Sequence, residues 1–142
     1  MYRKHIIFTQ KRDRKAVELE IELQSIASSY LFSPKIQDVI FTDNYCDIIM
    51  DKIDTMCLAD LYGDKPTDLP YFLWAKIHEV VQVLYEKEGI EYVDITPYNF
   101  IEHENKIYII DFGDAYYKGD KPRNWFHKDF LNKPYGWNPD FA

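Results

Sequence analysis

The sequence contains little glycine and cysteine and no surplus of positive charge. Only five glycines occur in 142 residues, and they form neither a G-x-G-x-x-G segment nor another glycine-rich phosphate-binding loop. The formal net charge of -7 disfavours a broad nucleic-acid-binding surface, because clustered Lys and Arg side chains provide the affinity for nucleic-acid phosphates. A basic cluster at Lys11, Arg12, Arg14 and Lys15 is interpreted as a solvated turn that leads into a helix.

Long apolar runs and disulfide patterns are also missing. No segment reaches the length of about 18 apolar residues that a membrane-spanning helix needs, and the apolar run near the N-terminus is too short for a signal peptide. The two cysteines, Cys46 and Cys57, lie in apolar surroundings without metal-binding spacing to the histidines, so we predict buried free thiols. We therefore expect a cytoplasmic or otherwise intracellular protein in a reducing compartment, with no membrane attachment.

The chain does contain enough apolar material for a folded domain. Hydrophobic residues make up 46% of the sequence and aromatic residues 17%, which is typical of a globular chain rather than a disordered one. The spacing of these residues predicts an order of elements. The first elements are a strand over residues 5–8, a helix from Asp13 to Ser33-Pro34 and a hairpin of residues 36–41 and 46–50. A short helix over residues 56–61 follows, and then a helix over residues 70–87 that is capped by Thr67 or Asp68 and ends at Gly89. The last element is a second hairpin of residues 100–102 and 106–110.

The residues that carry chemistry lie in two segments on either side of the second hairpin: YVDITPYN at residues 92–99 and IIDFG at residues 109–113. The hairpin is expected to bring Asp94, Asn99 and Asp111 to one crevice. Mg²⁺ prefers carboxylate and amide oxygens, so Asn99 and Asp111 can hold it while Asp94 accepts the proton of a hydroxyl nucleophile, as phosphoryl transfer requires. Alternatively these side chains cap ordinary turns. Both segments in this order and at this separation favour the catalytic interpretation.

The two segments resemble the catalytic loop His-Arg-Asp-x-x-x-x-Asn and the Asp-Phe-Gly of protein kinases, and in particular the small atypical kinases of the RIO and KEOPS-associated type. The loop keeps Asp94 and Asn99 but not the His or the Arg, so switching by a phosphorylated activation loop is not expected. Thr96 stands where most protein kinases carry Lys, as it does in those atypical families. The resemblance implies ATP and Mg²⁺ as cofactors, metal ligation by Asn99 and Asp111, and a nucleotide-site role for Thr96.

The resemblance also implies the fold. We expect an α+β chain with a truncated bilobal protein-kinase-like fold, formed as one domain over residues 1–142. A small antiparallel sheet with one helix would make a reduced N-lobe over residues 1–51. A reduced, mostly helical C-lobe would follow over residues 52–142.

In this fold a strand Lys contacts the nucleotide phosphates and pairs with a helix Glu. Lys4 resembles the strand Lys, and Glu18, Glu20 and Glu22 compete for the partner role. Glu18 and Glu22 share one helix face while Glu20 lies on another, so only one register can pair with Lys4. We expect Glu20, because Glu-Ile-x-Leu resembles the local pattern of the family. The alternative is that Lys4 is solvent-exposed near a chain end, beside a solvated acidic face.

The segment Met50-Asp51-Lys52-Ile53 resembles the hinge that binds the adenine edge in kinases. The resemblance implies contacts from main-chain atoms of Asp51 and Ile53, with Met50 controlling the back of the pocket. A plain strand-to-helix connection is the alternative.

Two departures from the family pattern bear on activity. The Gly-rich loop and its two strands are missing, so another chain or a rebuilt segment must cover the phosphates, or nucleotide binding is weak. The first strand would then be an exposed sheet edge, which favours a homodimer or another protein partner across it. The second departure is the aromatic-rich segment after Gly113, predicted to form a short helix around residues 123–131 and to cover the base of the helical lobe.

Three functional hypotheses follow. The first is ATP- and Mg²⁺-dependent phosphoryl transfer by an atypical Ser/Thr protein kinase or ATPase, with Asp94, Asn99, Asp111, Lys4 and Glu20 as the catalytic set. The second is a catalytically weak or inactive pseudokinase that acts as a protein-interaction module. The third is a small-molecule kinase. Retention of Asp94, Asn99 and Asp111 together favours an enzyme, and the identity of the phosphate acceptor stays open.

Overall fold

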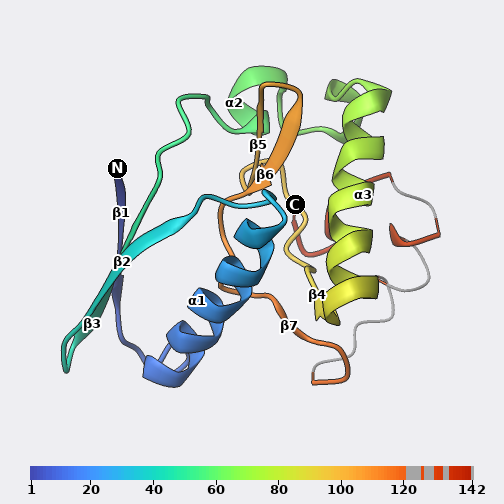
Figure 1. Ribbon diagram of the computed structural model, residues 1–142. Helices are drawn as coiled ribbons and strands as arrows, with labels where there is room; N and C mark the ends of the chain where they lie inside the picture. The colour runs from blue at the N-terminus through green and yellow to red at the C-terminus, as the bar shows by residue number, and fades with distance from the viewer. Residues whose placement is uncertain (121–125, 127–129, 133–134, 142) are drawn as a thin grey trace.

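The computed structural model describes residues 1–120, 126, 130–132 and 135–141 of the chain. Short antiparallel strand pairings combine with helices, as expected for an α+β protein. In chain order (Figure 1) the elements are β1 (Tyr2–Ile7), α1 (Arg14–Ser29), β2 (Ile36–Phe41), β3 (Tyr45–Met50), α2 (Leu58–Tyr62), the 3-10 helix η1 (Pro66–Asp68), α3 (Tyr71–Glu88), β4 (Ile90–Glu91), β5 (Phe100–His103), β6 (Lys106–Ile109) and β7 (Tyr116–Tyr117).

The N-terminal part of the chain forms an antiparallel three-stranded sheet in the order β1-β3-β2. Alternate residues of the central strand, Cys46, Ile48 and Met50, are buried together with Ile6 of β1 and Val17 of α1. This alternation is what places one face of the sheet against a helix. Within the described chain β1 pairs only with β3 and therefore lies at a sheet edge, as predicted. Pairing of a second copy or another partner along this edge stays a prediction.

Helix α1 begins where the sequence predicted and ends earlier. The side chain of Asp13 accepts a hydrogen bond from the N–H of Ala16, which is the expected N-cap interaction. The helix stops at Ser29 rather than at Ser33-Pro34, and Leu31 takes a positive φ of 64°. The chain leaves the helix early because Ser33 donates its hydroxyl to the carbonyl of Ile109, a contact with the second hairpin that no local pattern reveals.

The same helix joins two hydrophobic cores. Its first half contributes Val17 to the core under the sheet, while Leu23 and Ala27 from its second half lie in the larger core around α3. Figure 1 shows α1 between the sheet and α3. The position of α1 relative to the C-terminal part is therefore determined by packing as well as by the chain connection.

Helix α3 buries the predicted stripe of apolar residues, which are Leu73, Ile77, Val80, Val81 and Leu84. The predicted caps are wrong: Thr67 and Asp68 belong to η1, and Pro70 is the N-cap residue of α3. Pro70 can fill this position because its extended backbone has no N–H in need of a partner, while its carbonyl accepts a hydrogen bond from the N–H of Leu73 at 3.0 Å. Gly89 ends the helix in the left-handed conformation with φ of 66°, as predicted.

Several of the described aromatic residues after β7 pack against α3. Phe126 lies 5.7 Å from the ring of Tyr85, and Trp137 lies 4.5 Å from the ring of Trp74. Phe126 and Phe130 are buried in the large core. These contacts confirm that this segment covers the helical part of the molecule. The short helix predicted around residues 123–131 falls largely outside the described residues.

Cys46 is buried as predicted, whereas Cys57 is only half-buried and its Sγ lies 3.3 Å from a carboxylate oxygen of Asp60. Both thiols are free. In the described part of the chain, none of the helices combines the length and the apolar character needed to cross a membrane.

Candidate active site

The predicted catalytic loop follows β4 and precedes β5, and its polar side chains bond to each other. The side-chain amide of Asn99 donates to the backbone carbonyl and to the carboxylate of Asp94, each at 2.8 Å. The backbone N–H of Asn99 also donates to the carbonyl of Thr96, closing the turn at 3.2 Å. Both amide hydrogens of Asn99 are thereby engaged, which leaves its amide oxygen as the atom able to ligate a cation.

Tyr92 stands at the loop position where the kinase pattern has His, and it links the loop to the Asp-Phe-Gly segment. Its ring is fully buried and packs edge-on against Phe112 and Phe100, with ring centroids 5.3 Å and 5.9 Å away. Its hydroxyl donates to the backbone carbonyl of Asp111 at 2.6 Å. The sequence shows only that the His of the kinase pattern is absent. No local pattern indicates that Tyr92 can form a hydrogen bond with the backbone of Asp111.

The loop and the Asp-Phe-Gly segment are also joined by a strand pair that was not predicted. Residues Glu91 and Tyr116, of β4 and β7, are paired antiparallel, so the chain entering the loop lies beside the chain leaving Gly113. Gly113 donates its N–H to the Asp111 carboxylate at 2.8 Å, which orients that carboxylate.

Of the three competing glutamates, Glu20 is the one that contacts Lys4. The distance from Lys4 Nζ to Glu20 Oε2 is 2.5 Å, and the Glu20 side chain is only 2% exposed. Glu18 instead pairs with Arg14 at 3.6 Å, and Glu22 accepts a hydrogen bond from Tyr117. The Lys4 ammonium also lies 3.3 Å from Asp111 Oδ1, which brings the strand lysine and the predicted metal ligand together.

Arg12 was missed by sequence analysis. It was interpreted as part of a solvated basic turn, but its guanidinium donates to Glu20 Oε1 at 2.5 Å. The Glu20 carboxylate therefore has a cation on each oxygen, Lys4 on one and Arg12 on the other. A count of local charges cannot reveal this contact, because it depends on how β1 and α1 pack.

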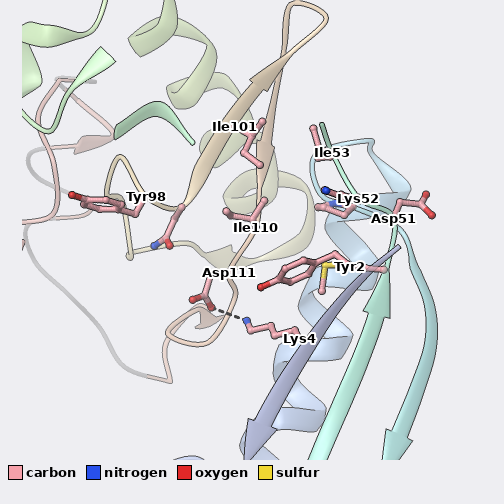
Figure 2. A pocket seen from close by; sticks show the side chains of 12 residues that line it. Tyr2, Lys4, Asp51, Lys52, Ile53, Tyr98, Ile101, Ile110 and Asp111 are labelled. Carbon is pink, nitrogen blue, oxygen red and sulfur yellow. Dashed lines mark hydrogen bonds and ion pairs between the residues drawn. The ribbon is translucent and has the colours of Figure 1, made fainter. Parts of the chain in front are cut away.

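A cavity of about 420 Å³ lies between the sheet and the second hairpin, within the size range of small-molecule sites. Figure 2 shows Lys4 and Asp111 at one end of it, Asp51, Lys52 and Ile53 at the other. The residues that line it are Tyr2, Lys4, Pro34, Met50, Asp51, Lys52, Ile53, Tyr98, Asn99, Ile101, Ile110 and Asp111. Most of the predicted nucleotide-site residues thus line the same cavity, and Tyr2 and Tyr98 are additions that the sequence did not indicate.

The segment predicted to be the hinge lines the cavity, and one of its main-chain donors is already used. The N–H of Asp51 donates to the carbonyl of Lys35 at 3.0 Å, so among its main-chain groups only the carbonyl can serve a ligand. Met50 is buried at the end of β3, where its sulfur accepts a hydrogen bond from Gln24 of α1 at 3.4 Å. Thr96, predicted to bind the nucleotide, is nearly buried and is not part of the cavity wall.

Burial raises the pKa of Asp94 above that of an ordinary aspartate. The hydrogen bond from Asn99 acts in the opposite direction, while the nearby carboxylates of Asp114 and Asp111 raise the pKa further. A carboxylate with a raised pKa is a stronger proton acceptor than an exposed one, which suits a general base. Asp114 is a further site neighbour that sequence analysis did not name.

The oxygen ligands available here fit Mg²⁺. Among the residues that the structure describes, no group of three or more His, Cys, Asp or Glu side chains could hold a metal ion. Asn99 and Asp111 nevertheless offer an amide oxygen and a carboxylate at the cavity wall. Mg²⁺ commonly needs no more from the protein, because water and nucleotide phosphates complete its shell.

Lys4, Asn99, Asp111 and the segment from Met50 to Ile53 line one cavity, Glu20 contacts Lys4, and Asn99 contacts Asp94. The family model for the RIO domain matches residues 14–132. The chain belongs to the RIO domain family, an atypical protein-kinase-like family, and the predicted fold class is thereby confirmed. Membership supports a general ATP-dependent kinase or ATPase role. No curated protein matched the sequence.

Proposed function

We propose that the protein binds Mg²⁺-ATP in this cavity and transfers the terminal phosphoryl group to a hydroxyl, as an atypical Ser/Thr protein kinase or as an ATPase. One observation carries the proposal: the hinge segment, Lys4, Asn99 and Asp111 line the same cavity. Adenine recognition and phosphate chemistry need these groups at opposite ends of one site.

The apolar part of the cavity suits the adenine ring. Ile101 and Ile110 line the cavity from the side of the second hairpin (Figure 2). The carbonyl of Asp51 and the main chain of Ile53 supply the polar edge, and Met50 limits the depth. Few polar groups on an apolar wall are typical of nucleotide sites, because burial supplies affinity while the polar groups orient the base.

The charged end of the cavity suits the phosphates. Lys4 contacts the α- and β-phosphates in this proposal, and Glu20 positions it through the 2.5 Å contact. The oxygens of Asn99 and Asp111 hold Mg²⁺, which when bound neutralises phosphate charge. Lys4 lies 3.3 Å from Asp111 Oδ1, so the proposed phosphate-binding cation is next to the proposed metal ligand.

Asp94 acts as the proton acceptor. It takes the proton of the attacking hydroxyl as the hydroxyl oxygen bonds to the terminal phosphorus and the bond to the ADP oxygen breaks. Its hydrogen bond to Asn99 fixes its direction relative to the metal ligands. The donor of that hydroxyl is proposed to be a Ser or Thr side chain of a protein, or water in the ATPase case.

Thermal unfolding with and without nucleotide tests the proposal. At a Mg²⁺-ATP concentration of about 100 times the Kd, linkage predicts roughly 2.7 kcal/mol of added stability, hence a Tm increase of several degrees. Asp111→Asn should lose the Mg²⁺-dependent part of this shift, whereas the exposed Asp64→Asn should keep all of it. A folded wild-type protein without any shift would contradict nucleotide binding.

Phosphate transfer and ATP hydrolysis form the second step of the test. Asp94→Asn should reduce both by about 10²- to 10⁴-fold while nucleotide binding persists. Activity that survives both Asp94→Asn and Asp111→Asn would assign the chemistry to other residues. Binding without any transfer would favour the interaction-module hypothesis, and transfer to a small hydroxyl compound alone would favour the small-molecule kinase.

A further inference from the structure

Arg12 holds the side of Glu20 that faces away from Lys4. Glu20 Oε2 accepts from Lys4 and Oε1 accepts from Arg12, both at 2.5 Å, in a carboxylate that is 2% exposed. Arg12 is not part of the nucleotide cavity wall. Through its hydrogen bond to Glu20, Arg12 is connected to Lys4 at the cavity wall.

The backbone fixes Arg12 at this place. In the connection between β1 and α1, Thr9 donates its N–H to the carbonyl of Arg12, and Arg12 donates its N–H to the hydroxyl of Thr9, each at 3.0 Å. The next residue, Asp13, caps α1. These two hydrogen bonds within the turn, and the helix that follows directly, fix the backbone of Arg12. The guanidinium therefore loses little conformational entropy when it contacts Glu20.

The guanidinium also lies against Gly113. A Cβ at position 113 would sit 3.1 Å from Arg12 Nη2 and 3.4 Å from Glu20 Oε1. The 3.1 Å separation is tighter than ordinary van der Waals contact, so a larger residue at position 113 would require its neighbours to shift by a few tenths of an ångström. The glycine of Asp-Phe-Gly thus makes room for the Arg12 contact as well as for its own turn.

The charges explain what the contact accomplishes. If Lys4 were the single cation beside the buried Glu20 carboxylate, the full negative charge of Glu20 would attract it, since ion pairs are strong where water is excluded. Arg12 remains charged at any working pH and neutralises one oxygen of Glu20 permanently. Lys4 then keeps positive charge for another anion, as its second contact with Asp111 at 3.3 Å illustrates.

We propose that Arg12 is a positioning residue for nucleotide phosphates: by sharing Glu20, it holds the carboxylate in place and leaves Lys4 free to contact phosphate oxygens. The inference rests on the proposed function, because it assigns Arg12 a role at the same nucleotide site. It adds a residue from the turn before α1 to the phosphate end of a site that has no glycine-rich loop in this sequence.

Binding measurements on Arg12 variants test the inference. Calorimetric titration would give the Kd of Mg²⁺-ATP and of adenosine for wild type, Arg12→Ala, Arg12→Gln, Arg12→Lys and the exposed neighbour Lys11→Ala. Loss of a residue that orients a ligand-binding group typically costs 10- to 100-fold, and we expect about 10-fold weaker ATP binding for Arg12→Ala and Arg12→Gln. Adenosine binding should be unchanged, because adenosine has no phosphates. Arg12→Lys should restore most of the loss, and Lys11→Ala should match wild type.

The outcomes separate this inference from the proposed function. Wild type that binds no ATP contradicts the proposed function itself. Wild type that binds ATP, with equal affinity in Arg12→Gln, overturns only the role of Arg12. Equal weakening of ATP and adenosine would show that Arg12 serves the fold alone and would also overturn the inference. Arg12→Gln keeps a hydrogen-bond donor to Glu20 without the charge, so it decides the question if Arg12→Ala does not fold.

Discussion

At the scale of single residues, the site contains a carboxylate with a raised pKa, Asp94, and the hydrogen bond from Asn99 orients it. Burial is the main reason why the pKa of Asp94 is raised, and the carboxylates of Asp114 and Asp111 add to it. Between the pKa of the unfolded chain and the raised pKa of the folded chain, the folded state binds more protons. Ionised Asp94 therefore lowers the stability of the folded protein at neutral pH.

The substitution Asp94→Asn should raise the stability of the folded protein and lower its activity. At pH 7 we expect this variant to be slightly more stable than wild type in urea unfolding, because it removes a half-buried charge and keeps an oxygen that can accept from Asn99. The difference should shrink as the pH falls through the raised pKa toward the ordinary aspartate value of about 3.9. Activity should fall about 10²- to 10⁴-fold, the usual contribution of a general base. A variant that is less stable than wild type at pH 7 would contradict the pKa assignment.

At the scale of elements, the position of α1 determines whether the charged groups meet. The helix presents Glu20 to Lys4 and Arg12. Two residues further along the helix, Glu22 accepts a hydrogen bond from Tyr117 of β7 at 2.6 Å. This contact raises the pKa of Tyr117 to about 12, mainly through the hydrogen bond to Glu22 and secondarily through burial. The Tyr117–Glu22 hydrogen bond connects α1 to the strand that follows Asp-Phe-Gly, and this connection needs no phosphorylated residue.

The substitution Tyr117→Phe should loosen α1 while leaving α3 unaffected. We expect a stability loss below about 1 kcal/mol, because the hydrogen bond is close to the surface, and faster amide hydrogen exchange in α1 than in wild type. Tyr117 has a raised pKa when folded, so its contribution is complete below pH 10, the ordinary value, and is lost as the pH rises toward 12. Tyr71→Phe, at a side chain that is 81% exposed, is the matched control and should behave as wild type. Unchanged exchange in α1 would show that Tyr117 does not hold the helix.

At the scale of the whole molecule, the last described residues complete both the core and the catalytic loop. Trp137 packs on Trp74 of α3, and the backbone N–H of Asn138 donates to the carbonyl of Ile95 at 2.8 Å. The same segment thus covers the large core and bonds to the loop that carries Asp94. Stability of the core and geometry of the loop are coupled through it.

The substitution Trp137→Ala should therefore affect both properties. We expect a loss of about 2 kcal/mol in the free energy of unfolding, less than for a fully buried Trp because the side chain is half-buried. Turnover should also fall, through displacement of Ile95 and the loop. Tyr71→Ala, which truncates an exposed ring, should leave stability within about 0.5 kcal/mol of wild type. Urea unfolding and activity assays compare the three proteins, and equal stability of Trp137→Ala and wild type would contradict this packing role.

Much of the fold followed from local patterns. The cap at Asp13, the end of α3 at Gly89 and both predicted hairpins reflect interactions within a few residues, which is why spacing and turn chemistry were sufficient. The early end of α1 was not predictable, because it depends on Ser33 reaching Ile109 across 76 residues. The start of α3 was predicted to within one residue, but its N-cap residue was misassigned because several residues before it could cap a helix and local preferences did not distinguish among them.

The sequence alone predicted the residue types of the site and their order along the chain. Asp94, Asn99 and Asp111 lie in short motifs whose spacing is typical of phosphoryl-transfer sites. The choice of Glu20 over Glu18 and Glu22, the recruitment of Arg12 and the support of Asp111 by Tyr92 came only from packing. Lys4 and Asp111 are 107 positions apart, and contacts over such separations depend on how β1, α1 and the second hairpin assemble. Short motifs therefore specify which groups are present, and long-range contacts select which of them meet.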